Sequence, residues 1–206
     1  MPVATSVLLI RRRRPIGEPE GPGRTPSAGV TILEGTTGAG RICATLLELG
    51  VELSGVRQAA VDPDATPADL DGIDLSEAFD RVVLGSHLVN LPEEEPRAAW
   101  LRLAVRHLAP TGNLLLEHHP IDWAETAEPT APMPGATVGM EEVRRHPPFV
   151  SAVSTFDIGG RYVRQPFTAR VLSDEELAAV IAGAGLEVRR RLSPTWLEAA
   201  RPTIEA

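Results

Sequence analysis

The sequence has no lysine and a single cysteine among its 206 residues. Its positive charge therefore comes from arginine alone, and the one thiol, Cys43, cannot form a disulfide within the chain. Because Cys43 falls in a predicted helix, we expect a small apolar residue of the core and not a nucleophile. This cysteine usage fits a reducing cytoplasm.

An excess of positive charge and long apolar segments are also lacking. The formal net charge is -8 at pH 7, so most of the surface would repel the phosphates of a nucleic acid or an anionic membrane. Residues 6–10 are apolar but precede the run from Arg11 to Arg14, the reverse of the order in a secretory signal. We expect no nucleic-acid partner, no membrane span and no export. The Arg run is interpreted as a solvated tail, with a docking patch for an acidic partner as the alternative.

Apolar residues are frequent enough to form one core. They make up 43% of the chain, which suits a single domain over residues 29–206. Residues 1–28 are rich in arginine, proline and glycine, and we expect them to form a flexible N-terminal segment.

Strand and helix patterns alternate in the first half of the domain. Short apolar runs indicate strands, and apolar residues at helical spacing indicate helices between them. The expected strands are residues 30–34, 51–56, 79–84 and 113–119, and the expected helices are residues 39–49 and 93–108. Repeated strand–helix–strand units predict an α/β fold with parallel strands.

The second half has a different pattern. Residues 119–148 contain six prolines and little periodicity, which predicts a long loop that serves as a lid or as a partner interface. Residues 150–157 and 161–171 flank Gly159-Gly160 and predict a hairpin. Ser173 and Glu176 form a capping box for a helix that ends near Gly185, and residues 186–191 are predicted to be the last strand. The expected sheet is therefore mixed.

Four stretches in this order resemble one protein family. They read "VTILEGTTGAGR", "GVELSGV", "FDRVVLGSHLVNLP" and "LAPTGNLLLE". Over residues 29–192 the chain resembles the class I S-adenosylmethionine-dependent methyltransferases, particularly the small actinobacterial enzymes of secondary metabolism. The resemblance implies a Rossmann-like three-layer sandwich with an antiparallel C-terminal hairpin. It also implies S-adenosylmethionine as cofactor, bound by a loop that contains Glu34, Thr36, Gly38 and Gly40.

The sequence departs from the family pattern around this cofactor. Thr36 stands where the first glycine of the loop is expected, and its Cβ restricts a turn that glycine normally allows. Arg57 stands where the family has an acidic residue for the ribose hydroxyls, with Asp62 or Asp64 as the alternative ligand. Residues 57–78 are too few for a full helix and strand, so the third strand and its helix are expected to be missing or vestigial.

Polar residues that follow two of the predicted strands suggest chemistry. Ligands of open α/β sheets bind beyond the carboxyl ends of the strands. Two sets of residues are expected to converge there: Ser86, His87 and Asn90 after one strand, and Glu117, His118, His119, Asp122 and Trp123 after the other. We predict His119 as a general base oriented by Asp122, with His87 as the alternative base. In the competing interpretation these residues only cap strand ends. A metal site is not expected, because the adjacent His118 and His119 would point to opposite faces of a strand.

Three functional hypotheses follow from these patterns. The first is a methyltransferase-like protein that no longer uses S-adenosylmethionine and acts as a partner or stabilising subunit of a biosynthetic enzyme. An exposed apolar face left by the shortened segment would favour this role or a homo-oligomer. The second is an active O- or N-methyltransferase for a small molecule. The third is catalysis without S-adenosylmethionine in the same crevice, by proton transfer or intramolecular alkylation.

Overall fold

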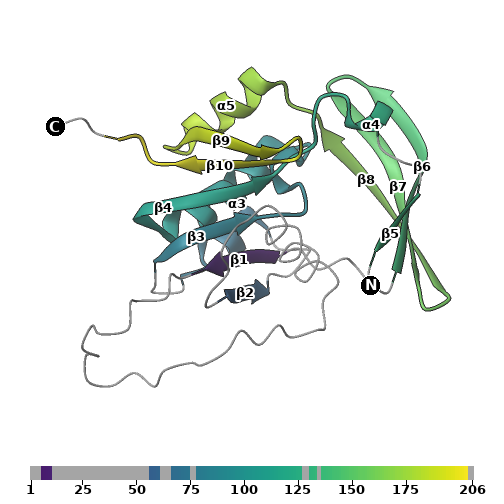
Figure 1. The fold of residues 1–206 in the computed structure, drawn as a ribbon, viewed down its shortest axis with the longest axis horizontal. Helices are drawn as coiled ribbons and strands as arrows, with labels where there is room; N and C mark the ends of the chain where they lie inside the picture. Colours follow the sequence, from purple (N-terminus) through teal and green to yellow (C-terminus); the bar gives the residue numbers. More distant parts are fainter. Residues whose placement is uncertain are drawn as a thin grey trace.

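The computed structural model describes residues 6–10, 56–60, 66–74, 78–126, 130–133 and 136–203. These residues form two separate β-sheets, one with helices packed on it and one without a helical layer of comparable size (Figure 1). Within them, no helix is long and apolar enough to cross a membrane.

The larger sheet has six strands in the order β2-β1-β3-β4-β10-β9. Strands β3 and β4 pair in parallel, and every other pair described in this sheet is antiparallel. The sheet is therefore mixed, as predicted. Its strands are β1 (Ser6–Ile10), β2 (Val56–Ala60), β3 (Phe79–Leu84), β4 (Leu108–Glu117), β9 (Glu187–Ser193) and β10 (Trp196–Ala200).

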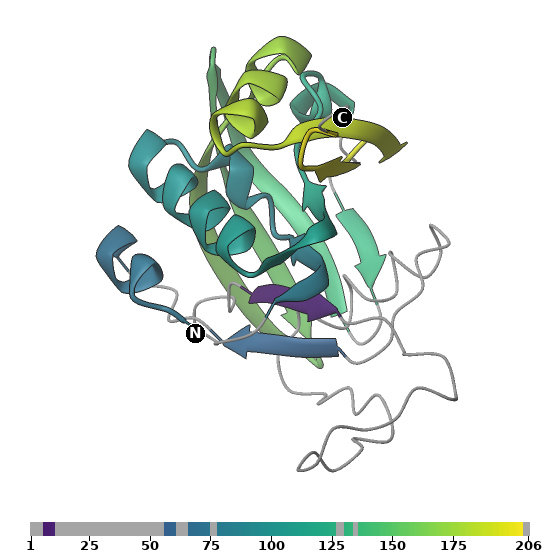
Figure 2. The ribbon, with the colours of Figure 1, turned by 90° about the vertical axis from the view of Figure 1, so that its left-hand side faces the viewer.

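Helices cover one face of this sheet. The 3₁₀ turn η1 (Leu88–Asn90) and helix α3 (Glu94–Arg106) connect β3 to β4, and α5 (Asp174–Gly183) precedes β9. Helices α3 and α5 lie on the same side of the sheet (Figure 2). Their buried residues share one hydrophobic core with alternate residues of β3, β4 and β10. The helix expected at residues 39–49, which would form the third layer, lies outside the described residues.

Acidic residues and a capping box explain where these helices begin. Glu94 and Glu95 lie in the first turn of α3, where negative charge is favoured by the helix dipole. The Ser173 side chain accepts a hydrogen bond from the backbone N–H of Glu176, and the Glu176 carboxylate accepts one from the N–H of Ser173. The capping box predicted for α5 is therefore confirmed.

The smaller sheet is antiparallel, in the order β5-β6-β7-β8. Its strands are β5 (Thr130–Met133), β6 (Ala136–His146), β7 (Phe149–Ile158) and β8 (Arg161–Arg170), and the short helix α4 (Trp123–Thr126) lies beside it (Figure 1). The hairpin predicted around Gly159-Gly160 is confirmed as β7–β8. It belongs to this second sheet and does not extend the first one.

The prediction of a long loop over residues 119–148 is wrong. This segment contains α4, β5 and the eleven-residue strand β6. Along β6 the half-buried Val138 and Met140 alternate with exposed or small residues, but the register shifts before Arg144 and interrupts the alternation. Pairing with β7 along its length, more than local pattern, stabilises this strand.

Two further elements differ from the predictions. Residues 6–10, placed in a flexible segment, form strand β1, which pairs with both β2 and β3. Residues 196–200 form β10, so the strand predicted at residues 186–191 is not the last one. β10 is easily overlooked because it is short and contains a charged residue, Glu198, although it lies inside the sheet between β4 and β9.

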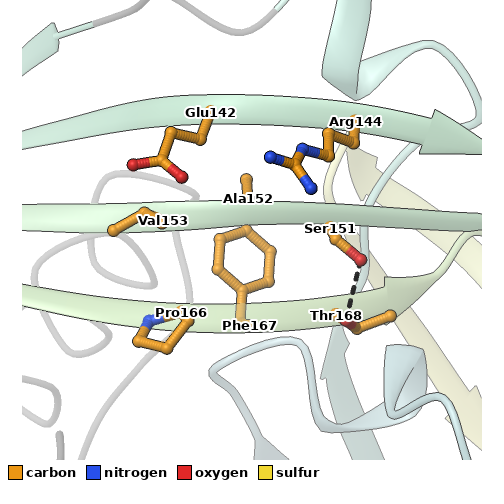
Figure 3. A pocket seen from close by; sticks show the side chains of 8 residues that line it. All are labelled: Glu142, Arg144, Ser151, Ala152, Val153, Pro166, Phe167 and Thr168. Carbon is orange, nitrogen blue, oxygen red and sulfur yellow. Dashed lines mark hydrogen bonds between the residues drawn. The ribbon is translucent and has the colours of Figure 1, made fainter.

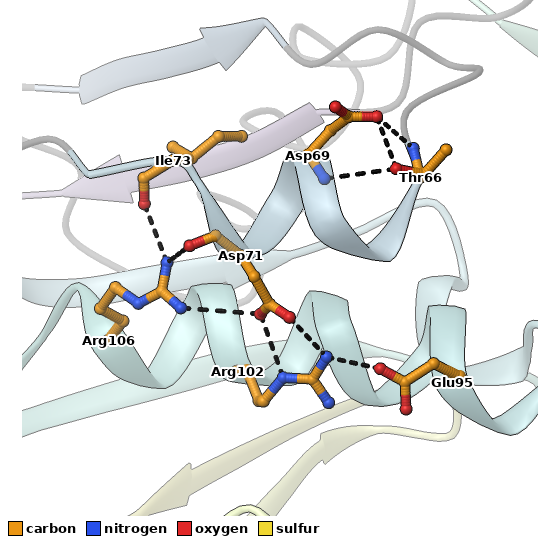
Figure 4. Close-up of polar contacts among 7 residues, drawn as sticks. All are labelled: Thr66, Asp69, Asp71, Ile73, Glu95, Arg102 and Arg106. Carbon is orange, nitrogen blue, oxygen red and sulfur yellow. Dashed lines mark hydrogen bonds and ion pairs between the residues drawn. The ribbon is translucent and has the colours of Figure 1, made fainter.

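Residues 57–78, where a strand and helix were expected to be missing or vestigial, contain all of β2 except its first residue, Val56, and the five-residue helix α2 (Pro67–Asp71). Leu70 of α2 is buried in the main core. Arg102 of α3 forms two hydrogen bonds with the Asp71 carboxylate, at 3.1 and 2.9 Å, and a third with Glu95 at 2.7 Å (Figure 4). Arg106 donates to the backbone carbonyls of Asp71 and Ile73. The short helix is thus fixed to α3.

The turn predicted at Thr111-Gly112 lies inside β4, at an irregularity in its pairing with β3. Gly112 is packed tightly there. A Cβ at this position would lie 2.9 Å from the carbonyl oxygen of Phe79 and 2.9 Å from Cδ1 of Leu108. Glycine is needed at this position because the backbone of β3 passes too close for a side chain.

Candidate functional site

The carboxyl ends of the parallel strands β3 and β4 meet at one edge of the larger sheet. Ser86, His87 and Asn90 follow β3, while Glu117 ends β4 and His119 follows it. The structure therefore brings together the two sets of polar residues that the sequence placed after these strands. Ligands commonly bind at this edge of an open α/β sheet.

A buried carboxylate and an imidazole form the centre of this site. The Glu117 side chain is 4% exposed, and its Oε1 lies 3.8 Å from Nε2 of His87. Its other oxygen, Oε2, accepts a hydrogen bond of 2.7 Å from the backbone N–H of Ser86. The His87 side chain is 29% exposed, so solvent or a ligand reaches the ring that Glu117 supports.

The backbone at this position adopts an unusual conformation. Ser86 and His87 have φ angles of 56° and 54°, in the left-handed region that few residues other than glycine adopt. Such residues cost about 1–3 kcal/mol each and persist where the surrounding structure fixes them. The hydrogen bond from Ser86 to Glu117 supplies part of that fixation and directs His87 toward the site.

Four aromatic rings extend from this centre to the smaller sheet. His87 stacks on His119 with ring centroids 3.7 Å apart, and His119 stacks on Trp123 at 3.9 Å. Trp123 in turn lies 6.2 Å from Phe167 of β8. We call His87, His119 and Trp123 the ring stack. His119 is its middle member and is enclosed by a ring on each face.

Enclosure changes the protonation of His119. Burial, followed by the nearby His87 and His118, lowers the pKa of His119 to about 2. Its imidazole is therefore neutral at physiological pH. A base is most effective when its pKa lies near the working pH, so this environment favours His87 over His119 as the proton acceptor.

Asp122, predicted to orient His119, occupies a different position. It is exposed in the turn before α4, and its carbonyl accepts hydrogen bonds from the N–H groups of Glu125 and Thr126. Among the described residues, no hydrogen bond joins the Asp122 carboxylate to His119. Its neighbour Trp123 contacts the imidazole instead, through stacking.

Asn90 links the site to both sheets. Its side chain is buried; Oδ1 accepts a hydrogen bond of 2.9 Å from the N–H of His119, and Nδ2 donates one of 2.8 Å to the carbonyl of Arg170. The sequence placed Asn90 near the crevice but did not assign it this role. Glu117 was also left without a role, although a carboxylate that directly follows the apolar run of a buried strand is a usable signal.

His118 is buried and lies outside the ring stack. Its backbone N–H donates to the carbonyl of Thr195, and Nη1 of Arg191 lies 3.4 Å from its Nε2. Burial is the main cause that lowers the pKa of His118. Within the part of the chain that the structure describes, no group of three His, Cys, Asp or Glu side chains is arranged to hold a metal ion.

The residues assigned to the cofactor loop, Glu34, Thr36, Gly38 and Gly40, lie outside the described residues, as do Asp62 and Asp64. The described strand beside β3 does not supply such a loop. β1 runs antiparallel to β3, and its last residue, Ile10, pairs with Arg81 near the start of β3. Its carboxyl end therefore lies at the edge opposite His87.

An open hollow of about 400 Å³ lies on the smaller sheet, over β6, β7 and β8 (Figure 3). Its lining residues include Glu142, Arg144 and the hydrogen-bonded pair Ser151 and Thr168. Phe167 also lines this hollow, but no residue of the ring stack does. A shallow surface depression without a buried charged group offers less chemistry than the edge at His87.

No family model and no curated protein matches the chain. Among solved structures it is similar to an S-adenosylmethionine-dependent methyltransferase from Clostridium acetobutylicum, with 12% identity and a TM-score of 0.51, over 80% of this chain and 71% of that one. It is also similar to DesVI from Streptomyces venezuelae (20% identity, TM-score 0.48) and to CalS10, an amino pentose methyltransferase from Micromonospora echinaspora (23% identity, TM-score 0.47). In both cases 65% of this chain is covered, and it spans 63% of the other chain.

Proposed function

We propose that this chain, which has the fold of the S-adenosylmethionine-dependent methyltransferases, transfers a methyl group to an oxygen or nitrogen of a small molecule. The observation that carries the proposal is the pair His87 and Glu117 at the carboxyl end of β3. Methyl transfer to a hydroxyl or amine group releases a proton, and this pair offers a base to accept it at the edge where open α/β sheets bind ligands.

The residues of the site have distinct roles in this reaction. S-adenosylmethionine, which the sequence resemblance assigns to the loop with Glu34, Thr36, Gly38 and Gly40, would supply an electrophilic methyl group when bound. His87 accepts the proton that the attacking oxygen or nitrogen loses. The Glu117 carboxylate, 3.8 Å away, stabilises the imidazolium that forms. His119 stays neutral, so no second positive charge opposes protonation of His87.

Titration of the full chain with S-adenosylmethionine and S-adenosylhomocysteine tests the proposal first. We expect a micromolar dissociation constant by isothermal titration calorimetry and a matching rise in the melting temperature, because ligand binds only the folded state. Absence of binding up to millimolar concentrations overturns methyl transfer by this chain.

The second part of the test is release of S-adenosylhomocysteine with a panel of small-molecule amines and alcohols. We expect His87→Gln to lower kcat by roughly 10²- to 10⁴-fold, the usual contribution of a general base, and to leave cofactor affinity unchanged. Glu117→Gln should also lower kcat, because it removes the carboxylate that stabilises the imidazolium. His146→Gln is the control, since His146 is exposed on β6. An equal loss in this control contradicts a specific role for His87.

A second candidate function rests on the sequence of the cofactor loop. Thr36 in place of glycine favours a protein that has lost S-adenosylmethionine and acts as a partner subunit of a biosynthetic enzyme. Arg57, expected to follow the second strand, lies inside β2 and pairs with Leu9, so its position gives no support to this role. This role predicts no cofactor binding, together with a stable complex with an enzyme encoded nearby. Deletion of this chain would then lower that enzyme's activity or yield. Turnover without S-adenosylmethionine that depends on His87 would instead indicate cofactor-independent catalysis.

A further inference from the structure

Trp123 belongs to the hydrophobic core of the smaller sheet. Its side chain is 7% exposed and packs with the buried Val150 of β7 and Ala169 of β8. Half-buried apolar residues complete the cluster, among them Ala124, Met140, Val143, Phe167 and Val171. The indole Nε1 is buried and makes no hydrogen bond within the described residues, so packing alone holds the ring.

A hydrogen bond fixes the backbone of α4 to the same sheet. Nη2 of Arg145 on β6 donates to the carbonyl oxygen of Ala124, the residue that follows Trp123. The register of β6 against β7 positions Arg145, because Arg145 pairs with Val150. The smaller sheet therefore determines where the indole lies, although the indole contacts a ring that follows β4 of the larger sheet.

The indole in turn shields His119. One face of that imidazole is covered by Trp123 and the other by His87, at centroid distances of 3.9 and 3.7 Å. If His119 were protonated, its charge would lie directly beside His87 and would oppose protonation of the base. Burial is the largest cause that keeps His119 neutral, and the stacked indole of Trp123 covers part of the ring.

We propose that Trp123 is a positioning residue for His87 and acts through His119. The sheet β5–β8 holds the ring stack in place. The catalytic part of this inference rests on the proposed function. The positional part concerns the protonation of the His119 imidazole, which can be measured whether or not the protein catalyses a reaction.

The charged and titratable groups around His119 come from four segments. His87 follows β3, Glu117 ends β4 and lies beside His87, and His118 precedes His119. Asp122 is exposed in the next turn, and Arg145 of β6 reaches the Ala124 carbonyl. The two neighbouring histidines oppose a charge on His119 and add to the effect of burial.

Histidine ring NMR of the full-length protein tests the positional part. In the wild type we expect His119 not to titrate between pH 5 and 8, because its pKa is about 2. Trp123→Ala removes the shield, so the pKa of His119 should rise toward its ordinary value and a titration should appear in this range. Trp123→Phe should keep His119 neutral, because the indole N–H has no partner to lose. If the His119 ring of Trp123→Ala still does not titrate between pH 5 and 8, the inference is overturned.

Kinetics of the same variants test the catalytic part. Misplacement of a catalytic group by about 1 Å costs on the order of 10²-fold in rate, so Trp123→Ala should lower kcat to that extent with cofactor affinity within twofold. Trp123→Phe should recover most of the rate. Arg145→Ala should give a smaller loss, with the exposed Arg161→Ala of the hairpin as its control.

The two parts fail in distinguishable ways. If no variant, including the wild type, binds S-adenosylmethionine or turns over, the proposed function is wrong while the NMR titration still decides the role of Trp123. If the wild type is active and Trp123→Ala retains full kcat, the positioning role is wrong while methyl transfer stands. Trp123→Phe and Arg145→Ala keep the test usable if Trp123→Ala does not fold.

Discussion

Single residues at this site have roles that spacing alone only partly indicates. The rule that ligands bind beyond strand ends correctly brought His87, Asn90 and His119 together. It could not indicate that His87 and His119 stack face to face, because ring orientation depends on the left-handed backbone at His87. The same limit explains why Asp122 was chosen over its neighbour Trp123, whose contact with His119 is set by packing on the other sheet.

Gly112 gives a prediction at the residue scale. Gly112→Ala places a Cβ 2.9 Å from the backbone oxygen of Phe79, which cannot move without disturbing β3. We expect a loss of about 1–3 kcal/mol in the free energy of unfolding, the usual cost of overpacking, measured by urea denaturation. Gly183→Ala is the matched control, because a Cβ there meets nothing within 4 Å. Equal effects of the two substitutions would contradict the close approach.

Secondary-structure elements divide into those fixed locally and those fixed by their partners. α3, α5 and the hairpin β7–β8 were predictable because caps, apolar periodicity and a Gly-Gly turn all lie within the element. β6 and β10 were not, since their pattern is interrupted and their stability comes from pairing with β7 and with β4 and β9. β1 was missed for a related reason: it is a short strand of five residues, apolar from Val7 to Ile10, beside an arginine-rich segment.

The capping box of α5 gives a prediction at the element scale. Ser173→Ala removes the acceptor for the N–H of Glu176, which should lower the free energy of unfolding by about 1 kcal/mol. For a chain of this size we expect the melting temperature to fall by roughly 2–4 °C in differential scanning calorimetry. Ser173→Asp preserves an N-cap acceptor and should stay near the wild type. If Ser173→Asp lowers the melting temperature as much as Ser173→Ala, the Ser173 hydroxyl does not stabilise the protein as an N-cap acceptor.

At the scale of the whole molecule, the fold class was predictable and the division into two sheets was not. Parallel β3 and β4 with α3 between them follow directly from the strand–helix–strand pattern. Nothing in the order of elements distinguishes a hairpin that extends a sheet from one that starts a new sheet. That choice depends on β6 and on Trp123, which give β7 and β8 a partner strand and a core of their own.

Asn90 gives a prediction at this scale because it bridges the end of β4 and the end of β8. Asn90→Ala leaves the half-buried N–H of His119 and carbonyl of Arg170 without this partner. The loss of each hydrogen bond costs up to about 1–3 kcal/mol. We expect calorimetric unfolding to broaden or to separate into two transitions as the sheets uncouple. Ser151→Ala is the control, since its hydroxyl bonds Thr168 on the exposed surface. A single sharp transition in Asn90→Ala would contradict coupling through this residue.

The position of β10 has a consequence for the order of events during synthesis. β10 lies between β4 and β9, so it separates two strands that precede it in the chain. Until residues 196–200 have left the ribosome, β4 lacks one of its two partners among the described strands, and its exposed edge carries largely apolar side chains. β9 then lacks the one described strand with which it pairs. Unpaired apolar edges promote association between chains. The nascent protein therefore depends on residues 196–200 to protect the sheet from which the site is built.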